Sequence, residues 1–253
     1  MKVFLSTLAP IWSLARHPLQ CRLAPAPDID MNPLTILHDA FYFFRRHLWS
    51  IAQLCLPLII LEALGEQWVV HATGPNDVPM YDILVGLLFY PLYTGALILY
   101  LDARSNGEEP SKRDLWAMAL RLWPKFALLA AISTLLIMLG ISLFVLPGLW
   151  VMTKLVFAEY LLVLRGLTPL GALKQSFELS RGHFWRILGC ILGVLVPLWA
   201  LNGVSESVWP AEQYPALSLA IDIVNSFLQL FTSVVMFRLF MLVTDPTLQE
   251  PTR

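Results

Sequence analysis

Five ionisable residues lie inside apolar stretches, and Asp222 among them is close enough to the outer edge to be solvated, which leaves Glu62, Lys154, Glu159 and Arg238. A charge in hydrocarbon costs at least about 2.5 to 3.5 kcal/mol, so such residues normally face a partner or a water-filled cavity. In the helices predicted below, Glu62 and Lys154 would lie at a similar depth in the membrane, and so would Glu159 and Arg238. Lys154 and Glu159 are five residues apart, which places them on different helix faces. We therefore predict two ion pairs between helices, Glu62 with Lys154 and Glu159 with Arg238.

Glu62 also has a second carboxylate nearby, because Glu66 follows it at a spacing of four residues. This spacing puts both side chains on one face of a helix. Such a pair could share a proton or hold a cation in a translocation path. Alternatively, Glu66 reaches the interface on the outer side of the inner membrane, which Gln67 and Trp68 would mark.

Catalytic chemistry finds little support in the sequence. The chain has no GxSxG, HExxH, GxxxxGK[ST] or GxGxxG motif. His47 and His183 have no metal-ligand companion at a suitable spacing, and Cys21, Cys55 and Cys190 form no CxxC. We expect no enzyme activity, no cofactor and no metal. A net charge of -1 gives no bias toward nucleic acid.

The elements that must position these charges are membrane helices. Apolar residues make up 57% of the chain and charged residues 14%, against roughly 45 to 50% and about 25% in soluble domains. Since roughly 20 apolar residues cross a bilayer as a helix, we predict an all-α polytopic membrane protein with six transmembrane helices in three hairpins. The third and fourth spans would be joined by a tight turn at Pro147-Gly148. The predicted spans are 48–69, 82–101, 126–146, 149–164, 184–204 and 216–243.

Basic residues predict the orientation of these spans. Except for Lys154, every Lys and Arg falls on one side of the membrane, and the opposite loops, 70–81 and 205–215, hold neither residue. Cytoplasmic loops carry the excess of Lys and Arg. We therefore expect a multi-pass protein of the bacterial inner (plasma) membrane with both termini in the cytoplasm.

The ends of the chain are expected to lie outside the membrane domain. Residues 1–30 contain Pro10, Arg16 and a Pro-rich stretch that break any signal-peptide pattern. Asn32 is a suitable N-cap, and Pro33 suits the first position of a helix. We expect residues 1–30 to be a disordered leader or to precede a native start at Met31. Residues 31–245 would form one membrane domain and 246–253 a cytoplasmic tail.

An internal repeat links the starts of two spans. Shifting the chain by 136 residues matches eight of the nineteen positions in 33–51, which exceeds the one or two that a rough chance estimate gives. Each copy predicts an amphipathic helix, with a stripe of Leu34, Leu37, Phe41, Phe44 and Leu48 in the first. A weaker third copy covers 111–123, so an interfacial helix would precede each odd-numbered span. The candidate docking residues of this predicted collar are Arg45, Arg46, Trp49, Trp123, Arg181 and Trp185.

The collar has two interpretations. The headgroup boundary favours both Trp and Arg side chains, because each has an apolar part and a polar end. These helices could therefore simply anchor the spans at the correct depth. Alternatively, they could sense anionic lipid or dock a partner.

Three segments and a hairpin carry a family resemblance: 41–46 (FYFFRR), 140–148 (GISLFVLPG), 171–176 (GALKQS) and 237–242 (FRLFML). With them, residues 31 to about 243 resemble the YciC-like family of bacterial inner-membrane proteins. The hairpin also resembles the membrane domain attached to some glycerophosphodiesterases. The family resemblance implies an integral inner-membrane protein of a Gram-negative bacterium and supplies no catalytic residue to map.

These observations leave two leading functions. A membrane scaffold or interaction protein of the cell envelope fits the short loops and the missing catalytic motifs, with a membrane-protein partner or a second copy of the chain on the collar. A small-solute or lipid transporter is the alternative, favoured by the intramembrane charges. Substitution of Glu62 or Glu159 would impair transport, whereas Arg181→Glu would impair a scaffold.

Overall fold

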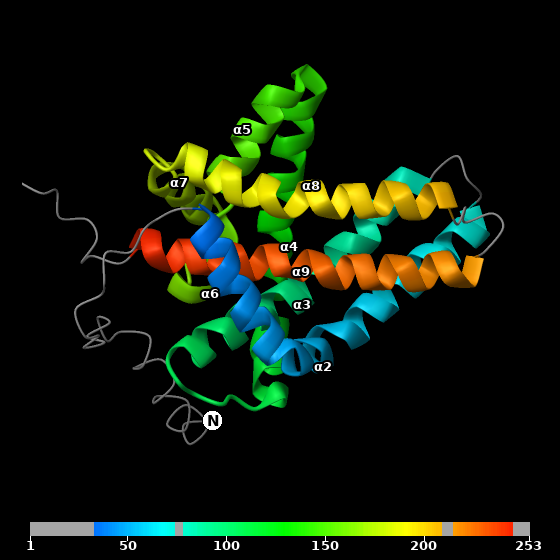
Figure 1. Ribbon diagram of the computed structural model, residues 1–253, viewed down its shortest axis with the longest axis horizontal. Coiled ribbons are helices and arrows are strands. Elements are labelled where there is room, and N and C mark those ends of the chain that lie inside the picture. The colour runs from blue at the N-terminus through cyan, green and yellow to red at the C-terminus, as the bar shows by residue number, and fades with distance from the viewer. Residues whose placement is uncertain (1–32, 74–77, 209–214, 245–253) are drawn as a thin grey trace, which may run out of the picture. The chain divides into compact units, whose positions relative to one another are not determined.

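The computed structural model describes residues 33–73, 78–208 and 215–244. The predicted leader, the Met31 start, Cys21 and the tail at 246–253 lie outside the described residues. The described helices belong to one compact unit, and no strand occurs among them. Their bounds are α2 Pro33–Thr73, α3 Val78–Ser105, α4 Lys112–Leu143, α5 Val145–Leu155, α6 Ala158–Arg165, α7 Pro169–Leu179, α8 Phe184–Val208 and α9 Pro215–Thr244 (Figure 1).

Six segments in this part of the chain are long and apolar enough to cross a membrane. They lie in α2, α3, α4, α5 with α6, α8 and α9. The all-α, six-span prediction is therefore confirmed. Only the second repeat copy forms a separate helix before its span, because α2 and α4 each run unbroken from the predicted interfacial segment into the apolar one.

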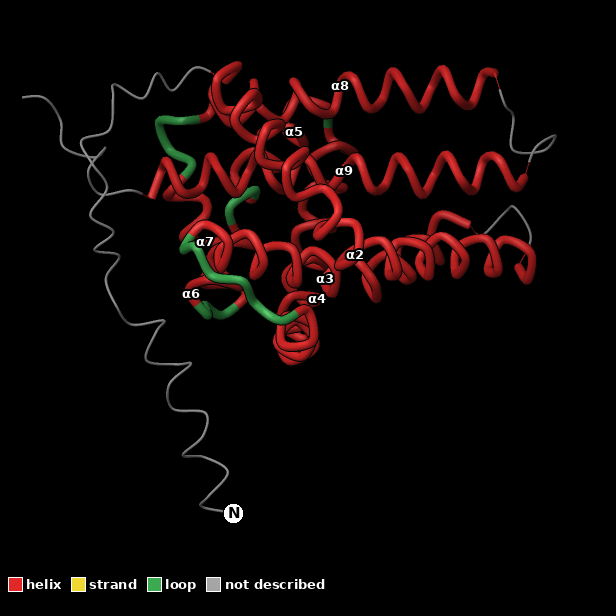
Figure 2. Tube along the Cα trace, turned by 60° about the horizontal axis from the view of Figure 1, so that its bottom comes forward, coloured by secondary structure: helices red, strands yellow, loops and turns green. Residues whose placement is uncertain are grey.

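Four elements share one direction. The second half of α2, the first half of α3, α8 and α9 run alongside one another in both views (Figures 1 and 2). Helix α2 contacts α3 and α9, and α8 contacts α9. In contrast, α4 and α5 run across this direction, and α4 is seen nearly end on in Figure 2. The third and fourth spans therefore do not lie parallel to the others, which the sequence alone did not predict.

The turn between α4 and α5 differs from its prediction. A single extended residue, Phe144, joins the two helices, and Pro147 and Gly148 lie in the first turn of α5. Proline is tolerated there because the first N–H groups of a helix have no partner within it. Gly148 lets the helices meet, since a Cβ built at Gly140 would lie 2.8 Å from the Gly148 Cα.

The fourth span is interrupted. Helix α5 ends at Leu155, and α6 begins at Ala158 and ends before Gly166, whose φ is +64°. Helix α7 then starts with Thr168 as N-cap and Pro169 at the first position. Gly182, with a φ of +83°, separates α7 from α8. The equivalent repeat position in α2 is Arg46, where the helix continues, so the copies differ in residue type at the point where one of them leaves the helix.

The buried face of α2 also differs from the predicted stripe. Ile36, Ala40 and Phe44 are buried, whereas Leu34 and Phe41 are 72% and 56% exposed. The Phe44 ring packs against Phe227 and Phe231 of α9, at centroid distances of 5.8 and 5.6 Å. The start of α2 therefore packs into the helical bundle through a neighbouring face of the same helix.

Candidate functional site

A cavity of about 510 Å³ lies among the helices, and all six candidate spans line it. Its volume falls within the range of about 300 to 1,000 Å³ that is usual for small-molecule sites. Glu62 of α2 and Glu159 of α6 both line this cavity, although 97 residues separate them in the chain. The structure thus brings two of the four predicted intramembrane charges to one place.

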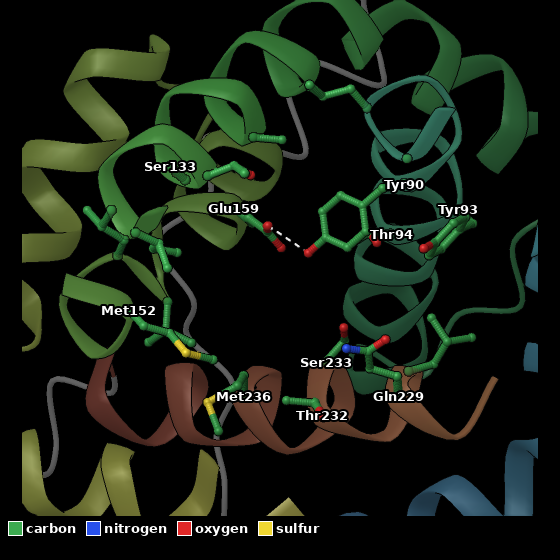
Figure 3. A pocket seen from close by; sticks show the side chains of 18 of the residues that line it. Tyr90, Tyr93, Thr94, Ser133, Met152, Glu159, Gln229, Thr232, Ser233 and Met236 are labelled. Atoms are coloured by element: carbon green, nitrogen blue, oxygen red, sulfur yellow. Dashed lines mark hydrogen bonds between the residues drawn. The ribbon is translucent and has the colours of Figure 1, made fainter. Parts of the chain in front are cut away.

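Glu159 is held by a tyrosine. The Tyr90 hydroxyl donates to Glu159 Oε1 at 2.8 Å across the cavity (Figure 3). Glu159 also lies in the first turn of α6, where the helix dipole favours a negative charge. The interruption before α6 thus gives this carboxylate a position that an unbroken fourth span would not provide.

Glu62 has a similar neighbour. Tyr93, one helical turn from Tyr90, lines the same cavity as Glu62. The Tyr90 and Tyr93 rings are 5.7 Å apart in an edge-to-face arrangement. Phe126 of α4 is fully buried and packs edge-on against Tyr90 at 6.4 Å. Helix α3 therefore brings two tyrosines into the cavity that holds both glutamates.

The α9 wall adds uncharged polar groups. Gln229, Thr232 and Ser233 face the cavity (Figure 3), and the Ser233 carbonyl accepts a 2.9 Å hydrogen bond from the Tyr160 hydroxyl. The Oγ1 atoms of Thr232 and Thr94 are buried without a hydrogen-bond partner. Buried polar atoms are normally paired, so these two unpaired hydroxyls are unusual features of the cavity wall.

The cavity is acidic. Its lining holds two carboxylates, three tyrosines and several hydroxyl or amide groups, with no Lys, Arg or His. Carboxylates and tyrosine faces both attract cations, the first by charge and the second by the ring quadrupole. Among the described residues, no three or more His, Cys, Asp or Glu side chains cluster as metal ligands would.

The two predicted ion pairs are wrong. Arg238 points out of α9 and lies 3.8 Å from Asp39 of α2. Lys154 is 7% exposed, and its Nζ donates to the Ser180 carbonyl at 3.3 Å. Sequence spacing estimated depth but not direction around the helix, and Glu62 and Glu159 turn inward. Lys154 instead lies beside the junction of α7 and α8, near Arg181. The predicted spans had placed Lys154 on the other side of the membrane from all other basic residues.

The collar residues are mostly on the surface. Arg45, Arg46 and Arg181 are exposed, and Trp49 and Trp185 are 73% and 79% exposed. Trp123 is different, because its indole N–H donates to the Leu88 carbonyl of α3 at 2.9 Å. It therefore packs α4 against α3.

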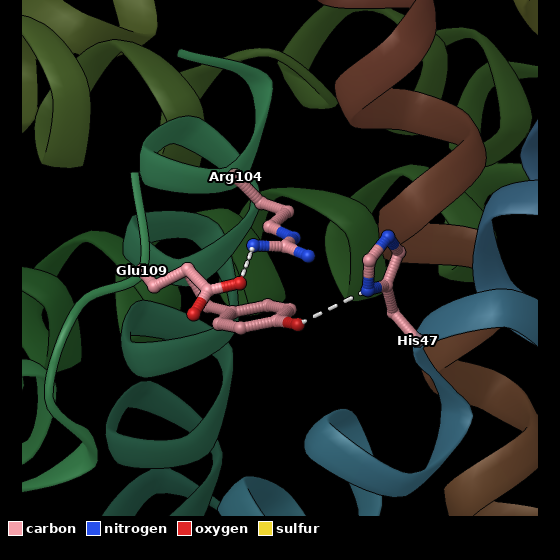
Figure 4. Close-up of polar contacts among 4 residues, drawn as sticks. His47, Arg104 and Glu109 are labelled. Carbon is pink, nitrogen blue, oxygen red and sulfur yellow. Dashed lines mark hydrogen bonds and ion pairs between the residues drawn. The ribbon is translucent and has the colours of Figure 1, made fainter. Parts of the chain in front are cut away.

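A second polar group joins α2 to the end of α3 (Figure 4). The Tyr100 hydroxyl lies 3.5 Å from His47 Nδ1, and Arg104 forms a 2.7 Å ion pair with Glu109. The Glu109 side chain is 79% exposed, so this pair contributes little to stability. We assign the group a structural role.

Sequence reasoning missed the tyrosines and threonines of the cavity. Tyr90 and Tyr93 lie three residues apart within an apolar stretch, a spacing that puts both hydroxyls on one helix face. Such a pair at the depth of an intramembrane glutamate was the available signal.

Known proteins place the chain among bacterial membrane proteins. The family model described as "Domain of unknown function (DUF7847)" matches residues 117–245, just over half of the 253 residues. Proteins named "UPF0259 membrane protein" from Yersinia pestis (strain Pestoides F) and Yersinia pseudotuberculosis serotype O:3 (strain YPIII) are each 25% identical over 203 residues, covering 79% of this chain and 77% of the relative. No solved structure matches the chain. The chain belongs to the family described as domain of unknown function DUF7847.

Proposed function

We propose that this protein binds a small organic amine in the central cavity and carries it across the membrane. One observation carries the proposal: Glu62 and Glu159 line a single cavity that has three tyrosines and no basic side chain. The proposed role is binding and passage, without covalent chemistry.

An ammonium group suits this lining better than an anion or an apolar molecule does. Either carboxylate would provide a charge-assisted hydrogen bond, and the rings of Tyr90, Tyr93 and Tyr160 line the same space, where a ring face would attract the cation. An anion would meet two carboxylates and no cationic partner. The hydroxyls of Thr94 and Thr232 would accept from or donate to polar groups elsewhere on the solute.

The interrupted fourth span supports a transport role. Sites of many transporters lie near the bilayer midplane and use discontinuous helices. The break between α5 and α6 lies directly before Glu159, and Val156 of the break lines the cavity. All six spans contribute to the lining, so relative movement of helices would open it to one side at a time.

The test is uptake of radiolabelled ethanolamine, choline and putrescine into proteoliposomes. We expect saturable uptake of at least one amine by the unaltered chain and loss of that uptake in Glu62→Gln and Glu159→Gln. Glu108→Gln is the matched control, because Glu108 is exposed and outside the cavity. Equal uptake by all four proteins, or by empty liposomes, would contradict the proposal.

A scaffold function is the second candidate, supported by the exposed side chains of Arg45, Arg46 and Trp49 on α2 and of Trp185 on α8. Exposed aromatic and arginine side chains are enriched where proteins meet. Extraction of the protein in polymer nanodiscs from its own membrane, followed by native mass spectrometry, tests this function. A stoichiometric protein companion that Arg45→Glu/Arg46→Glu releases would favour the scaffold, whereas recovery of the chain without one would count against it.

We also propose an inner-membrane location with both termini in the cytoplasm, supported by the one-sided basic residues. A background with Cys21→Ser leaves only the buried Cys55 and Cys190. In it, a membrane-impermeant maleimide applied from outside the inner membrane should label Ser207→Cys but not Ser111→Cys, both exposed positions. Inside-out vesicles should give the reverse result.

A further inference from the structure

A second cavity, of about 430 Å³, lies between α7 and the hairpin of α4 and α5. Its floor is apolar, formed by Leu136 of α4, Val151 and Leu155 of α5, and Leu173 and Phe177 of α7. Leu136 is 40% exposed and belongs to an apolar surface that continues along the hairpin to Phe144 and Leu146, which are 76% and 78% exposed. This surface can be covered only by lipid or by another apolar molecule.

The rim of the same cavity is charged. Lys174, Glu178 and Arg181 line it, and Lys154 lies beside it with its Nζ 5.5 Å from the centroid of the Phe177 ring. The three cations and one carboxylate leave a net charge of +2. Lys154 is buried, and among the described residues its Nζ donates one hydrogen bond, to the neutral carbonyl of Ser180. A buried ammonium without a carboxylate partner normally has an anion close by.

This wall is built by specific contacts. Ser176 Oγ donates to the Lys154 carbonyl at 2.8 Å, and Ser180 Oγ lies 3.5 Å from the same atom. Trp150 packs edge-on against Phe177 at 5.2 Å. These contacts attach the end of α5 to α7. They therefore hold the cationic rim in a fixed position beside the apolar floor.

We propose that this groove, defined by the eight residues that line it, binds one anionic phospholipid. The acyl chain would occupy the apolar floor, and the phosphate would be held by Lys174 and Arg181 near Lys154. Charge complementarity selects an anionic headgroup over a zwitterionic one, and the apolar floor selects a lipid over free phosphate. The inference is independent of the amine-binding cavity.

Native mass spectrometry of the full chain, released from nanodiscs of equal parts phosphatidylglycerol and phosphatidylcholine, tests the site. We expect one retained phosphatidylglycerol, and an affinity about tenfold or more lower in Lys174→Gln/Arg181→Gln. Arg121→Gln/Lys125→Gln removes two exposed basic residues of α4 outside the groove and should retain the lipid. Glu178→Gln removes the one acid of the rim and should strengthen binding.

Lys174→Gln/Arg181→Gln is expected to weaken lipid binding, and Glu178→Gln is expected to strengthen it. Misfolding cannot explain both results, because a general loss of structure would not produce tighter binding in Glu178→Gln. Equal retention of phosphatidylglycerol and phosphatidylcholine by the unaltered chain would overturn the proposal. So would equal loss of lipid in the two double variants, which would indicate a diffuse surface effect.

Discussion

The Tyr90 hydroxyl on α3 donates a 2.8 Å hydrogen bond to Glu159 Oε1 on α6, and this contact joins the second and fourth spans across the central cavity. It leaves one carboxylate oxygen of Glu159 for another donor. Tyr93, also on α3, lines the same cavity as Glu62. Helix α3 therefore holds Glu159 directly and adds a second tyrosine to the cavity that contains Glu62.

The contact between Tyr90 and Glu159 predicts energetic coupling. Tyr90→Phe keeps the ring and removes the donor, which should lower the free energy of unfolding by about 1 to 3 kcal/mol because the carboxyl stays buried. A double-mutant cycle with Glu159→Leu, which removes the acceptor, measured by unfolding in detergent, should show a coupling of at least about 0.5 kcal/mol. The same cycle with Tyr100→Phe should show none, since Tyr100 faces His47.

The lone hydroxyl of Thr94 predicts a separation of stability from binding. Thr94→Val should leave the thermal midpoint unchanged or raise it, because an unpaired buried hydroxyl costs about 1 to 3 kcal/mol, and should weaken amine binding. Thr153→Val is the control. Thr153 is equally buried, but its Oγ1 donates to the Trp150 carbonyl at 2.8 Å, so this change should lower the midpoint. Destabilisation by Thr94→Val would show that the hydroxyl serves the fold.

The close approach of α4 and α5 predicts that Gly148 tolerates no side chain. Gly148→Ala would push its Cβ against the backbone of Ile141, and overpacking of this kind costs about 1 to 3 kcal/mol. Gly203→Ala meets no atom within 4 Å and should stabilise α8 by up to about 1 kcal/mol. Thermal unfolding of both variants in one detergent compares them directly, and equal midpoints would mean that the hairpin is loosely packed.

The different burial of two residues of α4 predicts how strongly each contributes to stability. Phe126 is fully buried and Leu128 is 54% exposed. Phe126→Ala should lower the free energy of unfolding by about 3 to 5 kcal/mol, whereas Leu128→Ala should change it by no more than about 0.5 kcal/mol. Scanning fluorimetry of the purified variants measures the difference. A larger loss of stability in Leu128→Ala than in Phe126→Ala would contradict the assignment of Phe126 to the packed face of α4 and Leu128 to the lipid-facing one.

The sequence predicted the spans well because run length and hydropathy depend on composition alone. Glu62 and Glu159 could be singled out as intramembrane acids because charges are rare in hydrocarbon, but no sequence pattern indicated that both would line one cavity. Their predicted partners were wrong because spacing along a helix gives depth and no direction toward a neighbour. Lys154 shows this most clearly, since the interrupted fourth span brings it to Ser180.

The remaining differences come from packing. The crossing of α4 and α5 over α8 and α9 depends on contacts between distant segments, which no local pattern encodes. Pro147-Gly148 was a strong turn pattern, yet proline is equally acceptable in the first turn of α5. The cavity tyrosines escaped notice because a tyrosine in an apolar stretch usually indicates the membrane interface.

The most direct test of the central claim is equilibrium binding of radiolabelled ethanolamine, choline and putrescine to the full chain in nanodiscs. We expect saturable binding of at least one amine, weakened about tenfold or more by Glu62→Gln or Glu159→Gln alone and abolished in the double variant. Glu108→Gln should bind as the unaltered chain does. Binding that survives loss of both acids, or no saturable binding of any of the three amines, would contradict the account.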